Sequence, residues 1–315
     1  MKNLFTIKEG KVIVCSEDEA NIHVFIAPDV EEKKEIVERF SIDNNDLDSA
    51  LDPDEISRVE FMEKPISIIW KKPHFPAIGA VSHFEVSTVG FFINNDTLII
   101  IMSEESSLLS EKIFEKVNSI NDLMLRFFFY TIRQYSSNLK KIKQITSKIE
   151  SNLIRSMENK YFLQMFDISE RLIYYINAIE GNGAVLAKLR SNTEKLNLSQ
   201  RQVYYLDDII HENTQSGRQS AIYNSVLSGL MDARGNVINN NMNVLLKNLT
   251  LINVIFLPLN LLAGMGGMSE FSMVLSEYKI PWQTGYILLS VAMIGLGWLM
   301  WIFLKKYIGG NGNGE

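Results

Sequence analysis

Pro258-Leu-Asn-Leu-Leu-Ala-Gly-Met-Gly-Gly-Met-Ser-Glu270 is the stretch that decides the architecture of this chain. It closes a long apolar segment, holds an asparagine inside that segment, and ends in glycines followed by a serine and a glutamate. Polar side chains at membrane depth are costly, so they usually face a partner or water. The stretch therefore predicts the end of a membrane-spanning helix whose polar groups have a function.

Two apolar segments predict membrane spans. Residues 249–268 and 285–304 are each about 20 residues long, which is one bilayer crossing at ~1.5 Å per residue. Lys305 and Lys306 follow the second span directly and favour a cytoplasmic C-terminus for the basic tail, residues 305–315. Two spans then place the N-terminal part of the chain on the same side, and residues 269–284 form a periplasmic or external loop.

Composition limits the class of protein. A chain of 315 residues with 46% hydrophobic residues is long enough for one soluble core and a membrane part. The formal net charge of -6 argues against a nucleic-acid partner. The single cysteine, Cys15, excludes an internal disulfide framework and a cysteine-rich metal cluster. The first ten residues alternate polar and apolar side chains, and they lack the apolar core of a signal peptide.

The soluble part divides into two regions. Residues 1–105 predict an N-terminal α/β cytoplasmic domain, because short β-branched or aromatic runs bounded by turns occupy residues 12–15, 21–26, 66–70, 79–86, 88–92 and 97–102. Residues 30–40 and 45–51 look helical, and Pro53 predicts the start of a further helix. Residues 106–215 have helical periodicity and predict a helical cytoplasmic bundle. The fold class is therefore α+β with long helices.

Short motifs predict where helices break or begin in the helical region. Gly181-Asn-Gly183 predicts a break, and Asn197-Leu-Ser199 predicts the cap of a helix that runs through His211. The glycine-rich residues 309–314 predict a disordered end.

A polar stripe extends inward from the first span. Helical periodicity runs back without proline to about residue 216, so residues 216–268 predict a stalk helix that continues into the membrane. Steps of four and three residues place ten positions on one face: Asp232, Asn236, Asn239, Asn243, Leu246, Thr250, Asn253, Leu257, Asn260 and Gly264. Asparagine takes five of them, where a coiled-coil seam would be apolar. One interpretation is a ring of helices around water; the other is that asparagines join helices in lipid, worth about 0.6–2 kcal/mol each.

Leucines interrupt the stripe where the helix enters the membrane. Rings of Leu246 and Leu249 would gate a pore by dewetting. Ordinary packing at the same level is the alternative.

Several motifs together resemble one family. They are Leu123-Met-Leu-Arg-Phe-Phe-Phe-Tyr-Thr-Ile-Arg-Gln-Tyr135, Leu230-Met-Asp232, Asn243-Val-Leu-Leu-Lys-Asn-Leu-Thr250, Ile255-Phe-Leu-Pro-Leu259 and Gly267-Met268. This pattern resembles the CorA magnesium channel family over nearly the whole chain, most specifically from Tyr204 onward. The resemblance implies a funnel-shaped homopentamer in a bacterial or archaeal cell (inner) membrane, with both termini cytoplasmic. The first spans would line the pore and the second spans would form the outer ring.

The resemblance also assigns residues. The pore-facing positions are Asn243, Leu246, Leu249, Asn253, Leu257, Asn260 and Gly264. Asp232 falls on an aspartate ring below the inner gate. Asp208 falls on one half of a regulatory metal site between subunits, with Glu85 as the candidate for the other half; the alternative for Asp208 is a solvated acid on a helix face.

The chain departs from the family at the selectivity ring, Gly267-Met268-Ser269-Glu270, where the family has Gly-Met-Asn. Serine is shorter than asparagine, so its ring would be wider unless Gly266 and Gly267 let the backbone close in. Glu270 would add negative charges at the mouth and attract cations. An ordinary exposed acid is the other interpretation of Glu270.

These observations predict a CorA-like channel for divalent cations, with Mg2+ as the expected transported and regulatory ion. The ion would move down the membrane potential and gate the channel from inside. A second hypothesis keeps the fold and changes the ion to zinc, cobalt or nickel, with His23, His74, His83 and His211 as candidate ligands. A third is a non-transporting membrane-anchored scaffold. Enzymatic function has the weakest support, because no catalytic set of side chains stands out.

Overall fold

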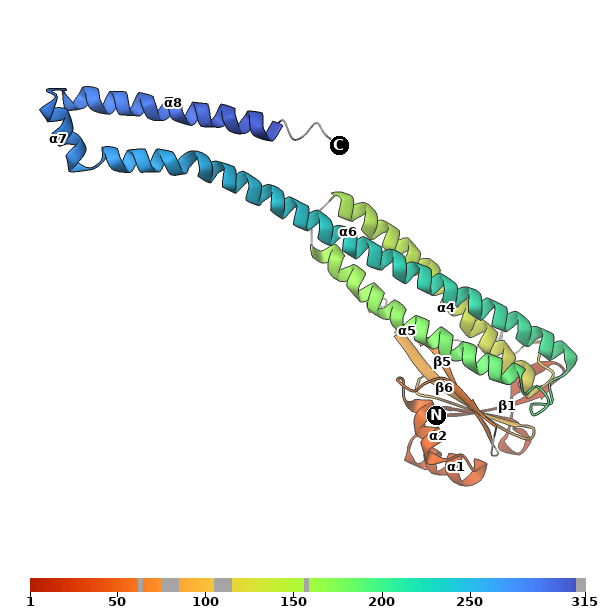
Figure 1. Cartoon of the computed structure of the whole chain (residues 1–315). Helices are drawn as coiled ribbons and strands as arrows, with labels where there is room; N and C mark the ends of the chain where they lie inside the picture. The colour runs from red at the N-terminus through yellow and green to blue at the C-terminus, as the bar shows by residue number, and fades with distance from the viewer. Residues whose placement is uncertain (62–64, 75–84, 105–114, 156–158, 310–315) are drawn as a thin grey trace. The chain divides into compact units, whose positions relative to one another are not determined.

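The computed structural model describes residues 1–61, 65–74, 85–104, 115–155 and 159–309. The chain divides into two compact units, Met1–Met231 and Asp232–Glu315. The 67-residue helix α6 (Gln200–Gly266) begins in the first unit and ends in the second (Figure 1).

A seven-stranded mixed sheet forms the base of the first unit. The strand order is β2-β1-β3-β7-β6-β5-β4, and every neighbouring pair is antiparallel except β3 and β7. The strands are β1 (Lys2–Lys8), β2 (Lys11–Val14), β3 (Ile22–Ile26), β4 (Arg58–Glu60), β5 (Ile66–His74), β6 (Glu85–Asn94) and β7 (Thr97–Met102). The predicted strands at residues 12–15, 21–26, 66–70, 88–92 and 97–102 are confirmed. Of the predicted run at residues 79–86, residues 79–84 lie outside the described residues.

The helices of the first unit are long, apart from two short ones. A 3-10 turn η1 (Glu17–Glu19) and helices α1 (Val30–Phe40) and α2 (Asn44–Leu51) follow the early strands; α4 (Ile120–Arg155), α5 (Asn159–Arg190) and α6 come later. The predicted helix from Pro53 is wrong. The side chain of Asp52 accepts the amide of Asp54 at 2.9 Å, which turns the chain directly toward β4 at Arg58.

The sheet is covered on both faces, because side chains alternate along each strand. Phe25, Ile69, Phe92, Ile99 and Ile101 pack with residues of α1 and α2. Their neighbours in sequence pack with residues of α4, α5 and α6: Val24, Ile26, Ile68, Trp70, Phe91, Ile93, Ile100 and Met102. Gly90 permits the close approach of α2, since a Cβ there would lie 2.5 Å from the Cβ of Ala50.

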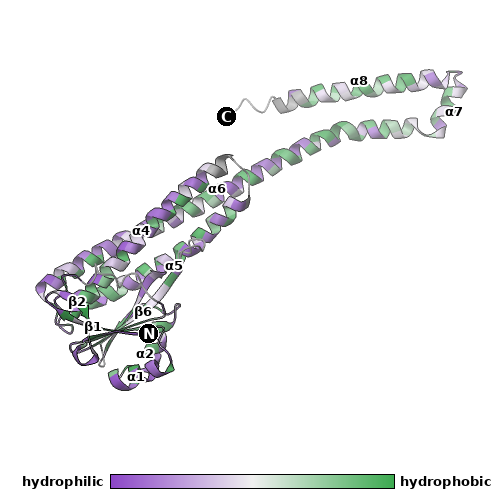
Figure 2. Cartoon of the chain, turned by 180° about the vertical axis from the view of Figure 1, so that it is seen from behind, coloured by the Kyte–Doolittle hydropathy of each residue, from purple (hydrophilic) through white to green (hydrophobic). Residues whose placement is uncertain are grey.

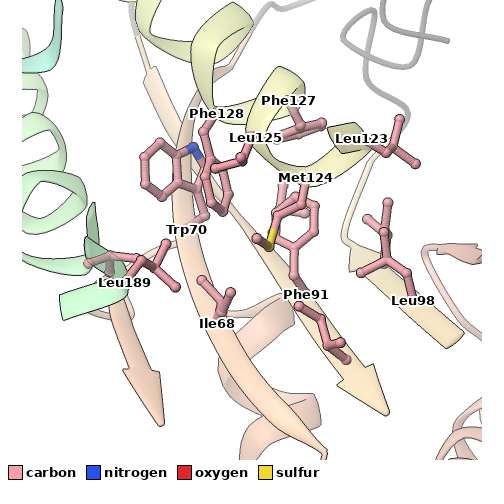
Figure 3. Close-up of a cluster of buried hydrophobic side chains, with 14 of the residues drawn as sticks. Ile68, Trp70, Phe91, Leu98, Leu123, Met124, Leu125, Phe127, Phe128 and Leu189 are labelled. Atoms are coloured by element: carbon pink, nitrogen blue, oxygen red, sulfur yellow. The ribbon is translucent and has the colours of Figure 1, made fainter. Parts of the chain in front are cut away.

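Aromatic stacking fixes α4 to the sheet. The Trp70 ring on β5 lies 4.1 Å from the Phe128 ring on α4, with 22° between the ring planes. Phe91 on β6 meets both Phe127 and Phe128 edge to face, at 5.0 and 5.4 Å. Figure 3 shows these rings gathered under α4 with Met124 and Leu125. The apolar residues Leu123 to Leu125, Phe127 and Phe128 of this motif therefore belong to the core, whereas Arg126 is only partly buried.

The predicted break at Gly181-Asn-Gly183 is also wrong, because α5 continues through it to Arg190. Asn182 is fully buried and bonds to strand β5. Its Oδ1 accepts the Lys71 amide at 3.0 Å and the Ser57 hydroxyl at 2.9 Å, and its Nδ2 donates to the Lys71 carbonyl at 2.8 Å. The flanking glycines lie at close contacts: a Cβ at Gly181 would lie 3.2 Å from Ser57 Oγ, and one at Gly183 would lie 3.0 Å from Asn213 Nδ2 of α6.

Beyond the sheet, α4, α5 and the first half of α6 run side by side as a helical bundle (Figure 1). Its core holds Tyr135, Leu139, Ile142, Leu172, Tyr175 and Leu227. The predicted cap at Ser199 is confirmed: Gln202 Oε1 accepts the Ser199 amide at 2.8 Å, and α6 begins at Gln200.

The second unit contains the apolar helices. Among the described residues, α6 and the Trp282–Leu304 part of α8 (Trp282–Gly309) are long and apolar enough to cross a membrane. Figure 2 shows that hydrophobic residues, in green, predominate over hydrophilic ones along α8, whereas α1 is mostly hydrophilic. The connection between these helices contains a helix of its own, α7 (Ser269–Glu277). Residues 310–315, which hold most of the predicted disordered end, lie outside the described residues.

We expect Asn182→Ala to lower the free energy of unfolding by about 2–4 kcal/mol, because the Lys71 amide and carbonyl would lose their buried partner. Thermal or urea unfolding of the purified chain would measure the change. Asn177→Ala, an exposed position on the same helix, is the matched control, and we expect about 0.5 kcal/mol or less there. Equal losses in both variants would contradict a structural role for the Asn182 amide.

Candidate functional site

One face of the membrane part of α6 is covered by its own chain. Its partly or fully buried residues recur every three or four positions: Leu251, Ile255, Pro258, Leu259, Leu262 and Gly266. Two of them contact α8, since Leu259 lies beside Gly297 and Gly266 lies against Leu289. Helix α8 therefore packs along this face.

The polar stripe lies on the opposite face of α6. With 3.6 residues per turn, positions 243, 246, 249, 253, 257, 260 and 264 centre on the side away from positions 251, 255, 259 and 262. All seven are exposed in the single chain, and Leu257 is 71% exposed. The α8 contacts thus leave the predicted pore-facing residues Asn243, Leu246, Leu249, Asn253, Leu257, Asn260 and Gly264 uncovered.

The asparagine side chains on this face need hydrogen-bond partners. Thr250, on the same stripe, satisfies its own hydroxyl by donating to the Leu246 carbonyl at 2.8 Å. An asparagine side chain carries both a donor and an acceptor, and hydrocarbon offers neither. Asn253 and Asn260 lie within the apolar segment, so they need other copies of the chain or water opposite them.

A short connection closes the outer end of α6. Tyr286 of α8 donates its hydroxyl to the Gly266 carbonyl at 2.8 Å, and its ring meets Phe271 of α7 at 5.8 Å. Sequence reasoning missed Tyr286; its signal is a tyrosine near the first turn of an apolar span, where polar-tipped aromatics concentrate. This bond ties the C-terminal end of α6 to α8.

The four residues predicted to form the selectivity ring, Gly267 to Glu270, lie at this end. Gly267 and Met268 link α6 to α7, whose first residue is Ser269. All four are exposed in the single chain, and Ser269 Oγ lies 3.1 Å from Glu270 Oε2. Glu270 is in the first turn of α7, where a negative charge is favoured by the helix dipole. The serine and the carboxylate thus form one polar group at the end of the stripe.

The three predicted regulatory residues are separate in the structure. Asp207 pairs with Arg190 at 2.6 Å, whereas the side chain of neighbouring Asp208 makes no hydrogen bond or ion pair with any described residue. Glu85 begins β6 and faces Arg171 of α5 at 4.0 Å. Asp232 is exposed on α6, at the start of the second unit. The structure therefore distinguishes Asp208, which the resemblance assigns to the regulatory site, from the neighbouring Asp207, which pairs with Arg190.

The histidines do not gather into a metal site within the described residues. His23 is buried in the sheet with its ring 4.8 Å from that of Phe40, and burial lowers its pKa. His74 bonds to Glu104, and His211 is exposed on α6. His83 lies outside the described residues. No group of three or more His, Cys, Asp or Glu side chains able to hold a metal occurs in the described part of one chain.

Known proteins resemble this chain in sequence and in fold. The curated cobalt/magnesium transport protein CorA of Methanocaldococcus jannaschii is 24% identical over 280 residues, covering 83% of this chain and 86% of that protein. The protein of the same name from Thermotoga maritima is 22% identical over 279 residues, covering 85% and 77%. The complete structure of the CorA magnesium transporter from M. jannaschii superposes with a TM-score of 0.79 at 22% identity, covering 97% of this chain and 96% of that one, which confirms the fold.

A family model identifies the protein family of the chain. The model described as CorA-like Mg2+ transporter protein matches residues 20–306. That span includes strands β3 to β7 of the sheet, the helical bundle, both apolar helices and the Gly-Met-Ser end of the stripe. It describes a transporter, in agreement with the expectation that the chain is not an enzyme. The chain belongs to the CorA-like Mg2+ transporter family.

Proposed function

We propose that the chain forms a membrane channel for hydrated divalent cations, Mg2+ foremost and Co2+ as well, with the α6 stripe lining the pore. The observation that carries this proposal is the placement of the stripe opposite the α8 contacts. If the asparagines only joined α6 to α8 in lipid, they would lie on the covered face.

Oxygen-lined walls suit the ion. Mg2+ dehydrates reluctantly and keeps several waters when it binds. Amide oxygens of Asn243, Asn253 and Asn260 would accept hydrogen bonds from those waters without stripping them. Leu246 and Leu249 would close the pore by dewetting where the helix enters the membrane. Five copies, the number that the resemblance implies, would repeat each residue as a ring.

The membrane potential would drive uptake. At about 2.3 kcal/mol per charge per 100 mV, a doubly charged ion gains ~4.6 kcal/mol on moving inward. This proposal places the first unit and both termini in the cytoplasm and α7 outside, in accord with Lys306 at the inner end of α8. The mouth would then be the ring of Ser269 and Glu270, and the carboxylates would raise the local cation concentration.

Regulation would use Asp208. Its carboxylate has no described partner in its own chain, and one chain offers no complete metal cluster among the described residues. An intracellular Mg2+ ion bridging Asp208 to Glu85 of a neighbouring copy would hold the subunits in the closed arrangement. Loss of the ion would leave like charges facing each other. Asp232 would form a further acidic ring at the inner end of the stripe.

Two alternatives remain distinct. Zinc or nickel transport by the same fold would need softer ligands, and the described histidines do not gather to supply them. A non-transporting scaffold would leave the stripe without a transport role. Competition between Mg2+ and zinc or nickel in a flux assay would distinguish the first alternative from the proposed Mg2+ channel. Absence of any flux would favour the scaffold.

We expect Asn253→Leu to reduce Mg2+ uptake into liposomes by about tenfold or more, since raising the barrier by ~1.4 kcal/mol is sufficient for that change. The leucine removes a ring of hydrogen-bonding oxygens from the stripe. Asn248→Leu is the matched control, because position 248 lies on the opposite face of α6. A normal uptake rate in Asn253→Leu would rule out this stripe as the pore lining.

A second prediction concerns the mouth. Glu270→Gln should lower Mg2+ uptake about threefold at low ionic strength and less at high ionic strength, because salt screens the attraction of exposed charges. Glu277→Gln removes the same charge from the other end of α7 and should have little effect. Uptake rates measured at several salt concentrations would decide, and a salt-independent loss would contradict the electrostatic role.

A third prediction separates the adjacent aspartates. Asp208→Asn should raise the internal Mg2+ concentration needed for half-maximal inhibition of uptake by about tenfold, which corresponds to ~1.4 kcal/mol of lost binding. Asp207→Asn, whose native side chain pairs with Arg190, should leave that concentration nearly unchanged. Liposomes loaded with graded Mg2+ would give both values, and the opposite order would overturn the assignment of Asp208.

A further inference from the structure

Two adjoining cavities lie where α4 and α6 begin, away from the stripe and within the first unit. The smaller, of about 170 Å³, is lined by Lys116, Asn118, Arg126, Arg201 and Tyr205, among others. The larger, of about 600 Å³, shares Lys116, Asn118 and Arg201 and adds Lys11 from β2. We call the smaller cavity, with Lys116, Arg126, Arg201 and Tyr205, the basic pocket.

The cations of this region are not neutralised by ion pairs. Lys11, Lys116, Arg126 and Arg201 make no salt bridge to any described carboxylate, although many other basic residues of the first unit do, such as Lys2, Arg39, Arg58 and Arg190. The chain as a whole carries a formal charge of -6. A group of unpaired cations in an acidic protein is therefore a local feature rather than a result of composition.

The one acid in the basic pocket is already engaged. Asp122 Oδ2 accepts the Asn118 amide at 2.9 Å, and its Oδ1 accepts Gln202 Nε2 at 2.7 Å. The bond from Gln202 joins the first turns of α4 and α6. Asp122 keeps its negative charge, and the three cations that line the basic pocket, Lys116, Arg126 and Arg201, outnumber it. Glu9 and Glu115 line only the larger cavity, where both are exposed and reduce its net positive charge.

The backbone adds to the positive potential. Helices α4 and α6 both begin here, at Ile120 and Gln200, and Gln202 Nε2 reaches across to Ser119 Oγ at 2.9 Å. The N-terminal end of a helix carries a partial positive charge. Two such ends beside the arginines favour an anion more than either does alone.

Tyr205 supplies a neutral donor. Burial raises the pKa of its phenol to about 12, so the hydroxyl stays protonated at physiological pH and can donate a hydrogen bond. Guanidinium groups bind phosphate oxygens in a bidentate manner, through two parallel hydrogen bonds. Arginine, lysine and a phenol around a small cavity match the oxygens of a phosphoryl group.

We propose that the basic pocket binds a small phosphate-bearing anion, with one phosphoryl group between Arg126 and Arg201 and the remainder of the ligand in the larger cavity beside Lys11. Inorganic pyrophosphate and a nucleoside triphosphate share this chemistry. The site lies on the α6 face that also carries Asp208, because positions 201, 205 and 208 are spaced by four and three residues.

Titration calorimetry of the full chain in detergent, without Mg2+, tests the proposal with pyrophosphate as the probe. We expect saturable binding of one pyrophosphate per chain, and we expect Arg126→Gln to weaken it by about tenfold or more. Arg218→Gln removes the same charge from an exposed position of α6 outside the pocket and should change the affinity about twofold or less. ATP in place of pyrophosphate distinguishes the sources: tighter binding of ATP indicates a nucleotide, and weaker binding an inorganic anion.

The melting temperature of each variant guards against a folding effect. Because Arg201 is more exposed than Arg126, Arg201→Gln is the second variant, and it should weaken pyrophosphate binding while leaving the melting temperature unchanged. Absence of saturable binding at millimolar pyrophosphate would overturn the proposal. Equal weakening by Arg218→Gln and Arg126→Gln would overturn it too, because that result indicates general charge attraction. Neither result depends on ion transport, so the channel proposal stands or fails separately.

Discussion

The cost of an unpartnered amide in a membrane is the constraint on which the second unit depends. Helix α8 covers one face of α6 with Leu259 and Gly266 at the contacts, and it leaves the asparagine face open. Lipid cannot satisfy Asn253 or Asn260, so the single chain is incomplete as a membrane structure. In the proposed channel, several copies with their stripes facing inward would satisfy the amides with water, and the same arrangement would create a path for hydrated ions. Assembly and transport would then follow from one requirement.

The first unit holds α6 rigidly at its other end. Trp70 and Phe128 fix α4 to the sheet, Asn182 fixes α5 to β5, and Gln202 joins the starts of α6 and α4. The bundle core extends along α6 as far as Leu227. Because the start of this helix is tied to two others and to the sheet, changes at Asp208 act on a supported element. In a frayed or isolated helix, a displacement at Asp208 would cause only a local distortion.

Patterns with strong periodicity could be predicted from the sequence, and features that depend on tertiary contacts could not. The strands at residues 21–26 and 97–102, the cap at Ser199 and the polar stripe follow from local pattern alone. Strand β4 has only three residues, too few for a periodic signal. The alternation along β1 is a strand signal, but it was interpreted only as evidence against a signal peptide. Gly181-Asn-Gly183 looked like a break because the bond from Asn182 to β5 joins residues 111 positions apart. The basic pocket, which draws on residues 116, 126, 201 and 205, could not be predicted for the same reason, and the ion pair with Arg190 distinguishes Asp207 from Asp208.

Asp208 and the polar stripe lie on one helix, which suggests how Mg2+ binding at Asp208 would affect the proposed gate at Leu246 and Leu249. Residues 208 and 246 are separated by about ten turns of α6. Hydrogen bonds within the helix oppose stretching, so a shift of its inner end is passed on as a rotation or tilt rather than lost. Pro258, which lacks an amide proton, lies beyond Leu246 and Leu249, so this weak point falls outside the segment between Asp208 and the proposed leucine gate. An anion in the basic pocket would act on the same helix, two turns from Asp208, and would change the local field that a regulatory cation meets there. Sensing of cations and binding of phosphate would then be coupled through one element, with no second pathway required.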